Sequence, residues 1–331
     1  MTQPRYDVLA IGNAIVDVIA DADEAFLAAE GLVKGSMRLI DEAESTRLYG
    51  RMKAGREISG GSAGNTAAGL ASLGLKVAYA GQVADDQLGT IYAHDIRAQG
   101  IDFVVPARGG IGATATSLIL VTPDAQRTMN TFLGATQRLE LGHFNPSIAA
   151  EADILYLEGY LWDPELPRAA MVEAMTAARG AGRKVALTLS DTFVVDRHGD
   201  DFRQLLDEGR LDILFGNEAE LIAMTGTTDF DAAVDALAPK VPLLVATHGE
   251  KGAMAVRGAE RARVPAEPVA RLVDTTGAGD LFAAGFLAGE ARGLGLERSL
   301  RLGAIAAAEV IGHYGARPEA DLKVLAAGLL A

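Results

Sequence analysis

The stretch DTTGAGDLF, residues 274–282, places three small residues and then an acid directly before the apolar segment LFAAGFLAG. A helix that begins here would present unpaired backbone N–H groups and about half a positive charge, which attract an anion. Gly277, Ala278 and Gly279 would let a phosphoryl group approach that backbone. Asp280 would lie beside the group, where a carboxylate can take a proton from an attacking hydroxyl. For this stretch alone, an ordinary capped helix with Asp280 favouring its dipole stays open.

Two further stretches join small residues to side chains that can hold hydroxyl groups. They are GGSAGN (60–65), with Gly60, Gly61, Ser62 and Asn65, and IGNAIVD (11–17), with Asn13 and Asp17. Either stretch alone is typical of a plain turn. Because both lie where a predicted strand meets the next element, together they predict a pocket for a polyol.

Two motifs further along the chain are suited to phosphate and metal. NEAE (217–220) closes a strand with an amide and carboxylates, which favours water-bridged Mg²⁺ and phosphate, although a solvated helix start is the alternative. THGEKG (247–252) has glycines on either side of Glu250 and Lys251, which indicates either a nucleotide-phosphate turn or a β-hairpin. Arg127 is a cation placed to reach a transferring phosphoryl group, and a surface arginine is the alternative.

Apolar strands that alternate with helical segments must position these residues. The predicted strands are 6–11, 76–83, 153–160, 184–189, 212–217 and 242–249, and the predicted helices include 67–74 and 166–182. This order predicts a mostly parallel sheet covered by helices on both faces. Ligands of such sheets bind beyond the carboxyl ends of the strands, which is where the motifs fall. The chain after residue 278 is predicted to be almost entirely helical.

Two stretches interrupt this alternation. Residues 14–20 and 36–40 flank a short acidic helical segment, and 113–122 and 127–135 predict a hairpin around the turn PDAQ at 123–126. Neither pair leaves room for a crossover helix. We therefore predict one α/β domain over residues 1–331, with a small β-rich lid formed by insertions at about 14–41 and 103–135.

Composition excludes several other classes of protein. The chain has 331 residues, of which 49% are hydrophobic, and a net charge of −14, which argues against a nucleic-acid partner. It has no cysteine, so disulfides and thiolate chemistry are excluded. The N-terminal residues lack the basic start of a signal peptide, and no apolar run approaches the ~20 residues that span a bilayer. We expect a cytoplasmic protein without a membrane partner.

DTTGAGDLFAAGF resembles the C-terminal signature of the ribokinase-like (PfkB) carbohydrate and nucleoside kinases, and GGSAGNTAAGLASLG resembles their N-terminal glycine signature. IGNAIVD, N-x-x-E at Asn217 and Glu220, and THGEKG follow in that family's order and at about its spacing. Five motifs in register, spread over nearly the whole chain, are far more specific than any one of them. The resemblance implies a Rossmann-like sheet sandwiched by helices, a small β lid, ATP as phosphoryl donor and Mg²⁺ as required metal.

Carried over position by position, the resemblance makes Asp280 the catalytic base and the backbone of Gly277, Ala278 and Gly279 the anion hole, with Arg127 beside the phosphoryl group. The positions carried over to the acceptor hydroxyls are Asn13, Asp17, Gly60, Gly61, Ser62 and Asn65. Those carried over to the ATP site are Asn217, Thr247, Gly249, Gly252 and Thr275, with Glu220 holding Mg²⁺ through water. Asp274 and Thr276 match more loosely the positions near a monovalent cation such as K⁺.

Within this family, residues 26–44, Arg127 and EGYLWD (158–163) are most similar to the adenosine-kinase branch. The resemblance implies phosphorylation of a primary hydroxyl of adenosine or a related nucleoside. A sugar such as ribose or fructose stays open as the acceptor, because sugar kinases share every catalytic motif. A purine would need a flat apolar slot, supplied by the lid and residues 133–139. Monomer and homodimer both stay open, because the outer face of such a lid is either bare or paired with a second lid.

Three other functions compete with a kinase. GGSAG (60–64) matches the G-x-S-x-G elbow of serine hydrolases, but that motif needs a strong preceding strand and AGREIS is a weak one. A Walker-type NTPase is excluded because the chain has no G-x-x-x-x-G-K-[ST]. A non-catalytic sugar-binding protein would keep the pocket motifs but has no use for Asp280.

Overall fold

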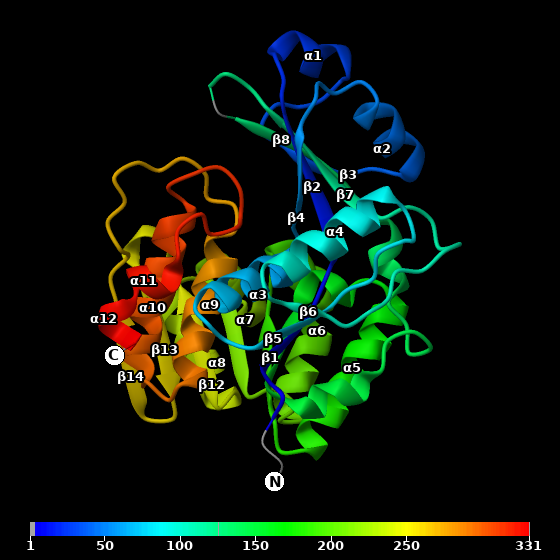
Figure 1. The fold of residues 1–331 in the computed structure, drawn as a ribbon. Coiled ribbons are helices and arrows are strands. Elements are labelled where there is room, and N and C mark those ends of the chain that lie inside the picture. The colour runs from blue at the N-terminus through cyan, green and yellow to red at the C-terminus, as the bar shows by residue number, and fades with distance from the viewer. Residues whose placement is uncertain (1–3, 125, 331) are drawn as a thin grey trace.

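The computed structural model describes residues 4–124 and 126–330. Within these residues the strands form a nine-stranded sheet and a five-stranded sheet, and the smaller sheet stands above the larger one in Figure 1. The predicted α/β architecture with a β-rich lid is confirmed. None of the helices in the described ranges combines the length and the hydropathy that crossing a bilayer would take.

The large sheet runs in the order β14-β13-β12-β11-β10-β9-β1-β5-β6. Its strands are β14 (Glu260–Val264), β13 (Ala253–Arg257), β12 (Leu243–Thr247), β11 (Ile213–Asn217), β10 (Lys184–Thr188), β9 (Ala152–Glu158), β1 (Tyr6–Ile11), β5 (Val77–Ala80) and β6 (Asp102–Phe103). The strands from β12 to β6 are parallel to their neighbours, and β13 and β14 are antiparallel. The sheet is therefore mostly parallel, as predicted.

Helices cover both faces of this sheet (Figure 1). They are α3 (Ser62–Ser72), α4 (Gln87–Ala98), α5 (Glu165–Gly180), α6 (Thr192–Asp207), α7 (Glu218–Thr225), α8 (Phe230–Leu237), α9 (Ala278–Ala291), α10 (Leu296–Val310), α11 (Leu322–Leu325) and α12 (Ala327–Leu330). Strand β1 shows how the two faces divide: Val8 and Ala10 pack into the core that contains α3, α9 and α10, while Leu9 and Ile11 pack into the core that contains α5 to α8. This is why the strand is apolar at consecutive positions.

Helix α9 is buried along its length from Leu281 to Gly289, which accounts for its apolar sequence. Its small residues allow neighbouring helices to approach closely. A Cβ added at Gly285 would collide with the carbonyl oxygen of Leu302 on α10, and one added at Gly69 on α3 would lie 2.6 Å from the Cβ of Ala284. The N-terminus of α9 is therefore held against two helices, on a rigid support.

The lid sheet runs in the order β3-β8-β7-β2-β4 and carries two short helices. Its elements are β2 (Ile15–Asp21), α1 (Glu24–Ala29), β3 (Met37–Leu39), α2 (Glu42–Tyr49), β4 (Arg56–Ser59), β7 (Ala115–Val121) and β8 (Arg127–Phe132). Strand β2 pairs in parallel with the central strand β7, from Ile15 with Ala115 to Asp21 with Val121. Strands β7 and β8 are antiparallel, as the predicted hairpin requires, and Ala125 of its turn lies outside the described residues.

The predicted lid bounds need two corrections. Strand β4 pairs with β2, so the first lid segment continues well past residue 41. At the other boundary, β6 pairs with β5 in the large sheet, so Asp102–Phe103 precede the second lid segment. The sequence indicates only a weak strand in AGREIS, because β4 is short and half charged, and does not place it in the lid; its pairing with β2 does.

Candidate active site

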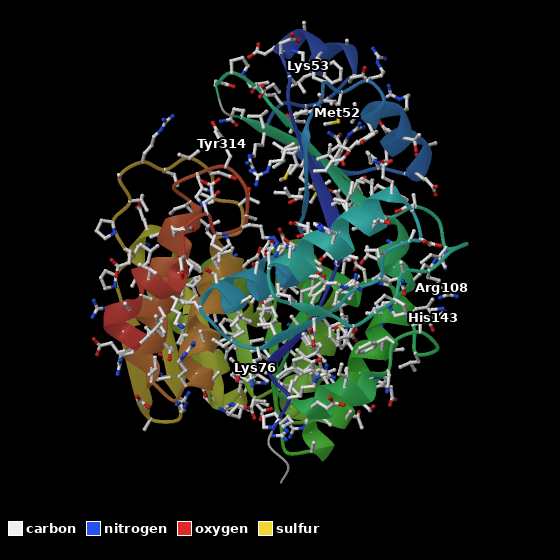
Figure 2. All side chains as sticks on the ribbon, in the orientation of Figure 1. Met52, Lys53, Lys76, Arg108, His143 and Tyr314 are labelled. Atoms are coloured by element: carbon white, nitrogen blue, oxygen red, sulfur yellow. The ribbon has the colours of Figure 1, made fainter. Side chains whose placement is uncertain are left out.

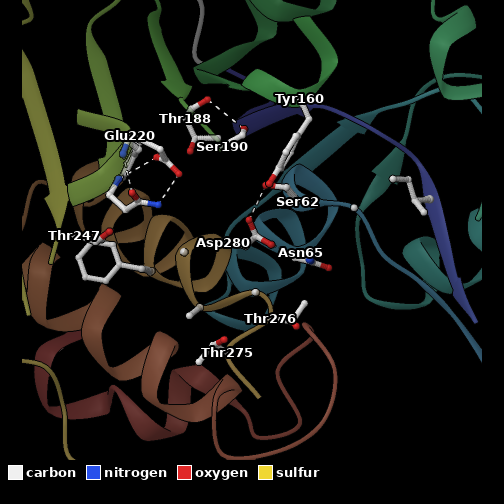
Figure 3. A pocket seen from close by; sticks show the side chains of 18 of the residues that line it. Ser62, Asn65, Tyr160, Thr188, Ser190, Glu220, Thr247, Thr275, Thr276 and Asp280 are labelled. Carbon is white, nitrogen blue, oxygen red and sulfur yellow. Dashed lines mark hydrogen bonds between the residues drawn. The ribbon is translucent and has the colours of Figure 1, made fainter. Parts of the chain in front are cut away.

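A cavity of about 400 Å³ lies between the lid and the carboxyl ends of the large sheet, which is large enough for a nucleoside-sized ligand. It is lined by lid strands, by the first turns of α3 and α9, and by the ends of β11 and β12 (Figure 3). The predicted site residues that line it are Asp17, Gly61, Ser62, Asn65, Asn217, Glu220, Thr247, Thr275, Thr276, Gly277, Ala278, Gly279 and Asp280. The structure thus brings together residues from separate motifs.

Asp280 lies on the first turn of α9 and is held by two residues of α3 (Figure 3). Ser62 Oγ donates a hydrogen bond to its Oδ1 at 2.6 Å, and Asn65 Nδ2 donates to its Oδ2 at 2.8 Å. Burial raises the pKa of Asp280 above its usual value, while these two hydrogen bonds and the charge of Arg317 act in the opposite direction. The carboxylate is therefore fixed in orientation and is a stronger base than an exposed aspartate.

The N-terminus of α9 provides a bare backbone surface next to Asp280. Gly277 has a φ of 80°, and a Cβ there would lie 2.9 Å from the Cα of Ala316, so only glycine fits. A Cβ on Gly279 would meet no atom within 4 Å, so this position faces open space. The N–H groups of Gly279 and Asp280 donate to no acceptor in the described part of the chain. This is the arrangement expected of an anion site at a helix N-terminus.

Asp17 lies on lid strand β2 and faces the cavity. Its carboxylate accepts no hydrogen bond from the described residues, and a Cβ at Gly60 would collide with it. Burial raises the pKa of Asp17 to about 7, although the charges of Arg317 and Arg127 lower it. The absence of a side chain at Gly60 therefore leaves room for the carboxylate of Asp17. That carboxylate is free to accept hydrogen bonds from ligand hydroxyls.

Asn13, like Gly60, is a predicted acceptor-site residue that does not line the cavity. It is buried, donates from Nδ2 to Glu158 and accepts at Oδ1 from Thr136 Oγ1 at 2.8 Å. Its amide thus makes one hydrogen bond through its nitrogen and one through its oxygen within the protein. Asn13 does not line the cavity in this structure, and a role toward a ligand hydroxyl stays a prediction.

Asn217 and Glu220 form a capping box at the start of α7. Glu220 Oε1 and Oε2 accept from Asn217 Nδ2 and N at 2.6 and 2.9 Å, and burial raises the pKa of Glu220 to about 7. Each carboxylate oxygen keeps a lone pair for a water molecule. No three acidic, histidine or cysteine side chains gather around a metal position in the described residues. The donors thus fit a divalent ion held through water and phosphate, rather than by direct protein ligands.

The THGEKG motif forms the turn between the antiparallel strands β12 and β13, which is the β-hairpin alternative. Thr247 lines the cavity, whereas Gly249 and Gly252 lie in the turn outside the lining. Gly252 has a φ of 94°, and a Cβ there would collide with the carbonyl oxygen of Val264. A close backbone approach by β14 therefore accounts for this glycine, and a role of the turn toward ATP stays a prediction.

Arg127 joins the lid to the loop before α9. Its Nη1 lies 2.7 Å from Asp274 Oδ2, and the two side chains are 9% and 7% exposed, so the surface-arginine alternative is wrong. Its guanidinium lies over the ring of Tyr314, which Figure 2 shows on the part of the C-terminal half nearest the lid. Among the described residues, Nε and Nη2 of Arg127 have no hydrogen-bond partner although they are buried. These two donors are suited to an anion.

Asp274 and Thr276 were predicted to lie near a monovalent cation. The Asp274 carboxylate accepts from Thr276 Oγ1 at 2.8 Å and from the N–H of Gly315 at 3.2 Å, in addition to Arg127. A cation bound to this carboxylate would therefore compete with the guanidinium of Arg127.

Apart from Asp17, sequence reasoning missed the cavity side chains that come from the lid strands. They are Ile15 on β2, Ser117 and Ile119 on β7, and Met129 and Thr131 on β8. The signal was available, because alternate residues of a strand point to the same face, and β2 alternates between buried and half-buried positions. The segment 133–139, expected to help form an apolar slot, does not line the cavity; Leu139 is buried in the core instead.

Arg317 was also missed, because no motif marks it. Its Nε donates to the carbonyl oxygen of Ser59 at 2.9 Å, and its Nη2 donates to Ser59 Oγ at 3.0 Å. Ser59 ends lid strand β4, so this arginine links the C-terminal segment to the base of the lid. Its positive charge lowers the pKa of both Asp17 and Asp280.

The structure does not support the hydrolase alternative at Ser62. The hydroxyl of Ser62 donates to Asp280, and no histidine of the described residues is within hydrogen-bonding distance of it. The strand before it, β4, belongs to the lid rather than to the central sheet. Both features differ from a nucleophile elbow, which needs a histidine base and a central strand.

Comparison with known proteins identifies the family of the chain. The sequence model of the family described as "pfkB family carbohydrate kinase" matches residues 7–322. The adenosine kinase of Sinorhizobium meliloti is 49% identical, with a TM-score of 0.90 over 98% of this chain and 99% of that one. A probable sugar kinase from Rhizobium etli is 45% identical, with a TM-score of 0.91 over 99% and 100% of the two chains. The adenosine kinase of Schizophyllum commune is 28% identical over 90% of this chain and 92% of that protein.

These similarities confirm the resemblance to the adenosine-kinase branch and the assignment as a phosphotransferase. The family match extends from β1 to α11, and the residues that gather around the cavity are those of the motifs that carried the resemblance. The chain therefore belongs to the PfkB family of carbohydrate kinases.

Proposed function

We propose that the protein transfers the γ-phosphoryl group of ATP to a primary hydroxyl of adenosine or a related nucleoside, with Asp280 as general base. The observation that carries this proposal is the placement of the Asp280 carboxylate, held by Ser62 and Asn65, next to the unpaired N–H groups at the start of α9. A base and an anion site side by side are what phosphoryl transfer to an alcohol needs.

The cavity wall favours a nucleoside over a simple sugar. The side chains of Ile15, Ile119 and Met129 bring an apolar surface from the lid to the same cavity as the Asp17 carboxylate. A nucleoside has an apolar base and a ribose diol, and these match the two kinds of surface. The similarity to the Sinorhizobium meliloti adenosine kinase supports this acceptor.

A sugar kinase is the second candidate. The similar proteins include the probable sugar kinase from Rhizobium etli and a 5-dehydro-2-deoxygluconokinase from Shouchella clausii, which is 26% identical over 94% of this chain. A sugar would use the same base and the same anion site, and would leave the apolar lid surface without a partner.

In the proposed reaction, Asp17 orients the acceptor diol and Asp280 accepts the proton of the primary hydroxyl as its oxygen attacks the γ-phosphorus. The bond from that phosphorus to the bridging oxygen breaks, and ADP leaves with the electron pair. The N–H groups of Gly279 and Asp280 stabilise the charge on the transferred group. Mg²⁺, held through Glu220 and Asn217, would neutralise the charge of the phosphates.

The lid should also limit wasteful hydrolysis of ATP. With Asp280 poised as a base, water in the acceptor position would react unless closure excluded it. The buried contact from Arg127 to Asp274 shows a lid strand already in contact with the anion-site loop. We therefore expect weak ATPase activity without an acceptor, and rapid acceptor-independent hydrolysis would contradict this role of the lid.

The test is a coupled ADP-release assay with Mg-ATP against adenosine, other nucleosides, ribose, fructose and phosphosugars. We expect turnover with adenosine and little with free sugars. Turnover with a free sugar alone would overturn the nucleoside proposal and support the second candidate, whereas no turnover with any of them would overturn both.

Replacement of Asp17 by Asn should raise the KM for the acceptor by about 10–100-fold, because hydrogen bonds from two hydroxyls to a carboxylate become weaker bonds to a neutral amide. The KM for ATP should hardly change, since Asp17 comes from the lid, across the cavity from Glu220 and Thr247. Initial rates measured with each substrate varied in turn separate the two effects. An equal rise in both KM values would show that Asp17 supports the fold of the site rather than the acceptor.

A further inference from the structure

Glu158, the last residue of β9, is a fully buried carboxylate that lies outside the cavity. Its Oε1 accepts from the backbone N–H of Asn13 at 2.7 Å and from the Asn13 side chain. Its Oε2 accepts from the N–H of Ala63 at 2.7 Å. A Cβ on Gly12 would collide with this carboxylate, so the backbone at the end of β1 packs closely against it.

Burying this charge is costly, and no cation offsets it. The ion pairs found among the described residues do not include Glu158. Burial raises the pKa of Glu158 to about 7, and the hydrogen bonds from Ala63 and Asn13 lower it only in part. All three neighbouring groups are donors, which matches an ionised carboxylate, because that form only accepts. A neutral side chain would stabilise the fold more, so the charge points to another role.

The helix that Glu158 contacts is the one that holds the catalytic base. Helix α3 begins after Gly61, which has no side chain to cap it. The Glu158 carboxylate takes the place of that cap by accepting from Ala63. The neighbouring residue Ser62 and, one turn on, Asn65 both donate to Asp280. A shift at Ala63 would therefore move both hydrogen bonds to the base.

On its other side, Glu158 is linked to the base of the lid. Asn13 connects β1 to lid strand β2, and its Oδ1 accepts from Thr136, which follows lid strand β8. Thr136 is itself fully buried. A continuous buried path of hydrogen bonds thus runs from Thr136 through Asn13 and Glu158 to Ala63.

We propose that Glu158 is a positioning residue for phosphoryl transfer, which aligns the start of α3, and through it Ser62, Asn65 and Asp280, with the lid segments that close on the acceptor. Glu158 does not line the cavity, so it acts through these residues and touches no substrate. The inference rests on the proposed function for the choice of acceptor and for the role of Asp280 as base.

The first test is Glu158→Gln, which keeps the shape but presents an amide N–H₂ to one of the three donors. We expect kcat/KM for the acceptor to fall about tenfold or more, since small displacements of catalytic groups are costly. The KM for ATP should stay within about twofold, because Asn217, Glu220 and Thr247 are positioned by β11, β12 and α7 rather than by α3. An unchanged kcat/KM for the acceptor would overturn the proposal.

The second readout is the pH dependence of thermal stability. If the charge of Glu158 served only to stabilise the fold, its removal would have the opposite effect on this pH dependence. Because burial raises the pKa of Glu158 to about 7, its neutral form favours folding below about pH 4.5, and this stability is lost as pH rises through 7. Gln mimics the neutral form. The Tm of the variant relative to the wild type should therefore rise between pH 5 and pH 8, whatever constant cost the amide N–H₂ adds at both pH values. A relative Tm that falls between pH 5 and pH 8 would show that the charge stabilises the fold, and would overturn the proposal.

Other titratable groups around Glu158 do not reverse this difference. They are Asp280 on α9, Tyr79 on β5, Tyr92 on α4, Tyr156 on β9 and Tyr160 after β9. Burial raises the pKa of each of these tyrosines, so they stay neutral from pH 5 to 8. Asp280 is present in both proteins, and its charge raises the pKa of Glu158, so this coupling acts in the same direction as burial and adds to the cost of the Glu158 charge near pH 8.

Glu290→Gln is the matched control. Glu290 is a largely buried glutamate at the far end of α9, where burial raises its pKa but ion pairs with Lys184 and Arg257 outweigh burial and lower it. This variant should lose stability near pH 8 and keep kcat/KM. Thr136→Val, at the other end of the path, should lower kcat/KM for the acceptor in the same direction as Glu158→Gln.

The kinetic tests of these variants use the acceptor that the wild type phosphorylates in the ADP-release assay. If the wild type is active on a sugar rather than on adenosine, the proposed acceptor has failed, and Glu158→Gln is judged with that sugar. If Glu158→Gln keeps wild-type kinetics on an active acceptor, the positioning role alone has failed. If the wild type turns over no acceptor of the panel, both the proposed acceptor and the positioning role of Glu158 are overturned.

Discussion

Replacement of Asp280 by Asn should lower kcat by about 10²–10⁴-fold, the range expected when a general base is lost. The geometry of the site can survive this change. Asn65 Oδ1 is buried and, among the described residues, without a partner, so its amide can turn over and accept from the introduced amide in place of donating to Asp280. Steady-state assays with the active acceptor, together with ATP binding by calorimetry, separate loss of chemistry from loss of binding.

The same variant carries its own check on folding. Burial raises the pKa of Asp280, so the neutral amide removes a cost of folding at neutral pH, and Tm should be unchanged or higher. Glu290→Gln on the same helix is the control for a largely buried carboxylate outside the cavity, and should keep kcat. A variant Asp280→Asn with kcat within tenfold of the wild type would remove Asp280 from the role of base.

Replacement of Gly279 by Val should lower kcat by about 10²–10³-fold, as does loss of preorganised donors to a transition-state anion. A Cβ at Gly279 meets no protein atom within 4 Å, so the new side chain enters the open space that we propose for the phosphoryl group. ATP affinity should fall by less than about tenfold, because the rest of the nucleotide contacts other parts of the cavity. Single-turnover rates and ATP binding measure the two effects.

Gly180→Val provides the control for this substitution. Gly180 ends α5, also has no atom within 4 Å of an added Cβ, and lies outside the cavity lining. Both variants place a β-branched residue at a helix end, at a small and similar cost in helix propensity. Equal losses of kcat and ATP affinity in Gly279→Val would count against an anion site at this backbone.

The sequence was most informative where function depends on short contiguous motifs. Gly277 to Asp280 and Gly61 to Asn65 were recognised because their residue types are unusual for the start of a buried helix, and both helix starts line the cavity. Topology then brings such junctions together, since parallel strands end at the same edge. Their meeting at the cavity followed from the fold class alone.

The parts that could not be predicted depend on partners distant in the sequence. Glu158 looks like a strand residue until β1 and α3 are placed around it, and Arg317 gains its role only where it contacts Ser59. Asn13 illustrates the reverse case: its type and position fit a hydroxyl ligand, but its side chain bonds Glu158 and Thr136 and does not line the cavity. Single-residue chemistry does not reveal which hydrogen bonds the fold has already made.

The parallel pairing of β2 with β7 has a consequence for the order in which the molecule folds. Ile15 on β2 pairs with Ala115 on β7, which is synthesised about a hundred residues later, and β4 pairs with β2. The lid sheet can therefore be completed only after the second lid segment has left the ribosome. Closing the long loop between β2 and β7 costs conformational entropy before the contacts between the two strands can form and offset that cost. The part of the protein that closes on substrate thus forms late in folding, and a nascent chain that stops before β7 has no lid.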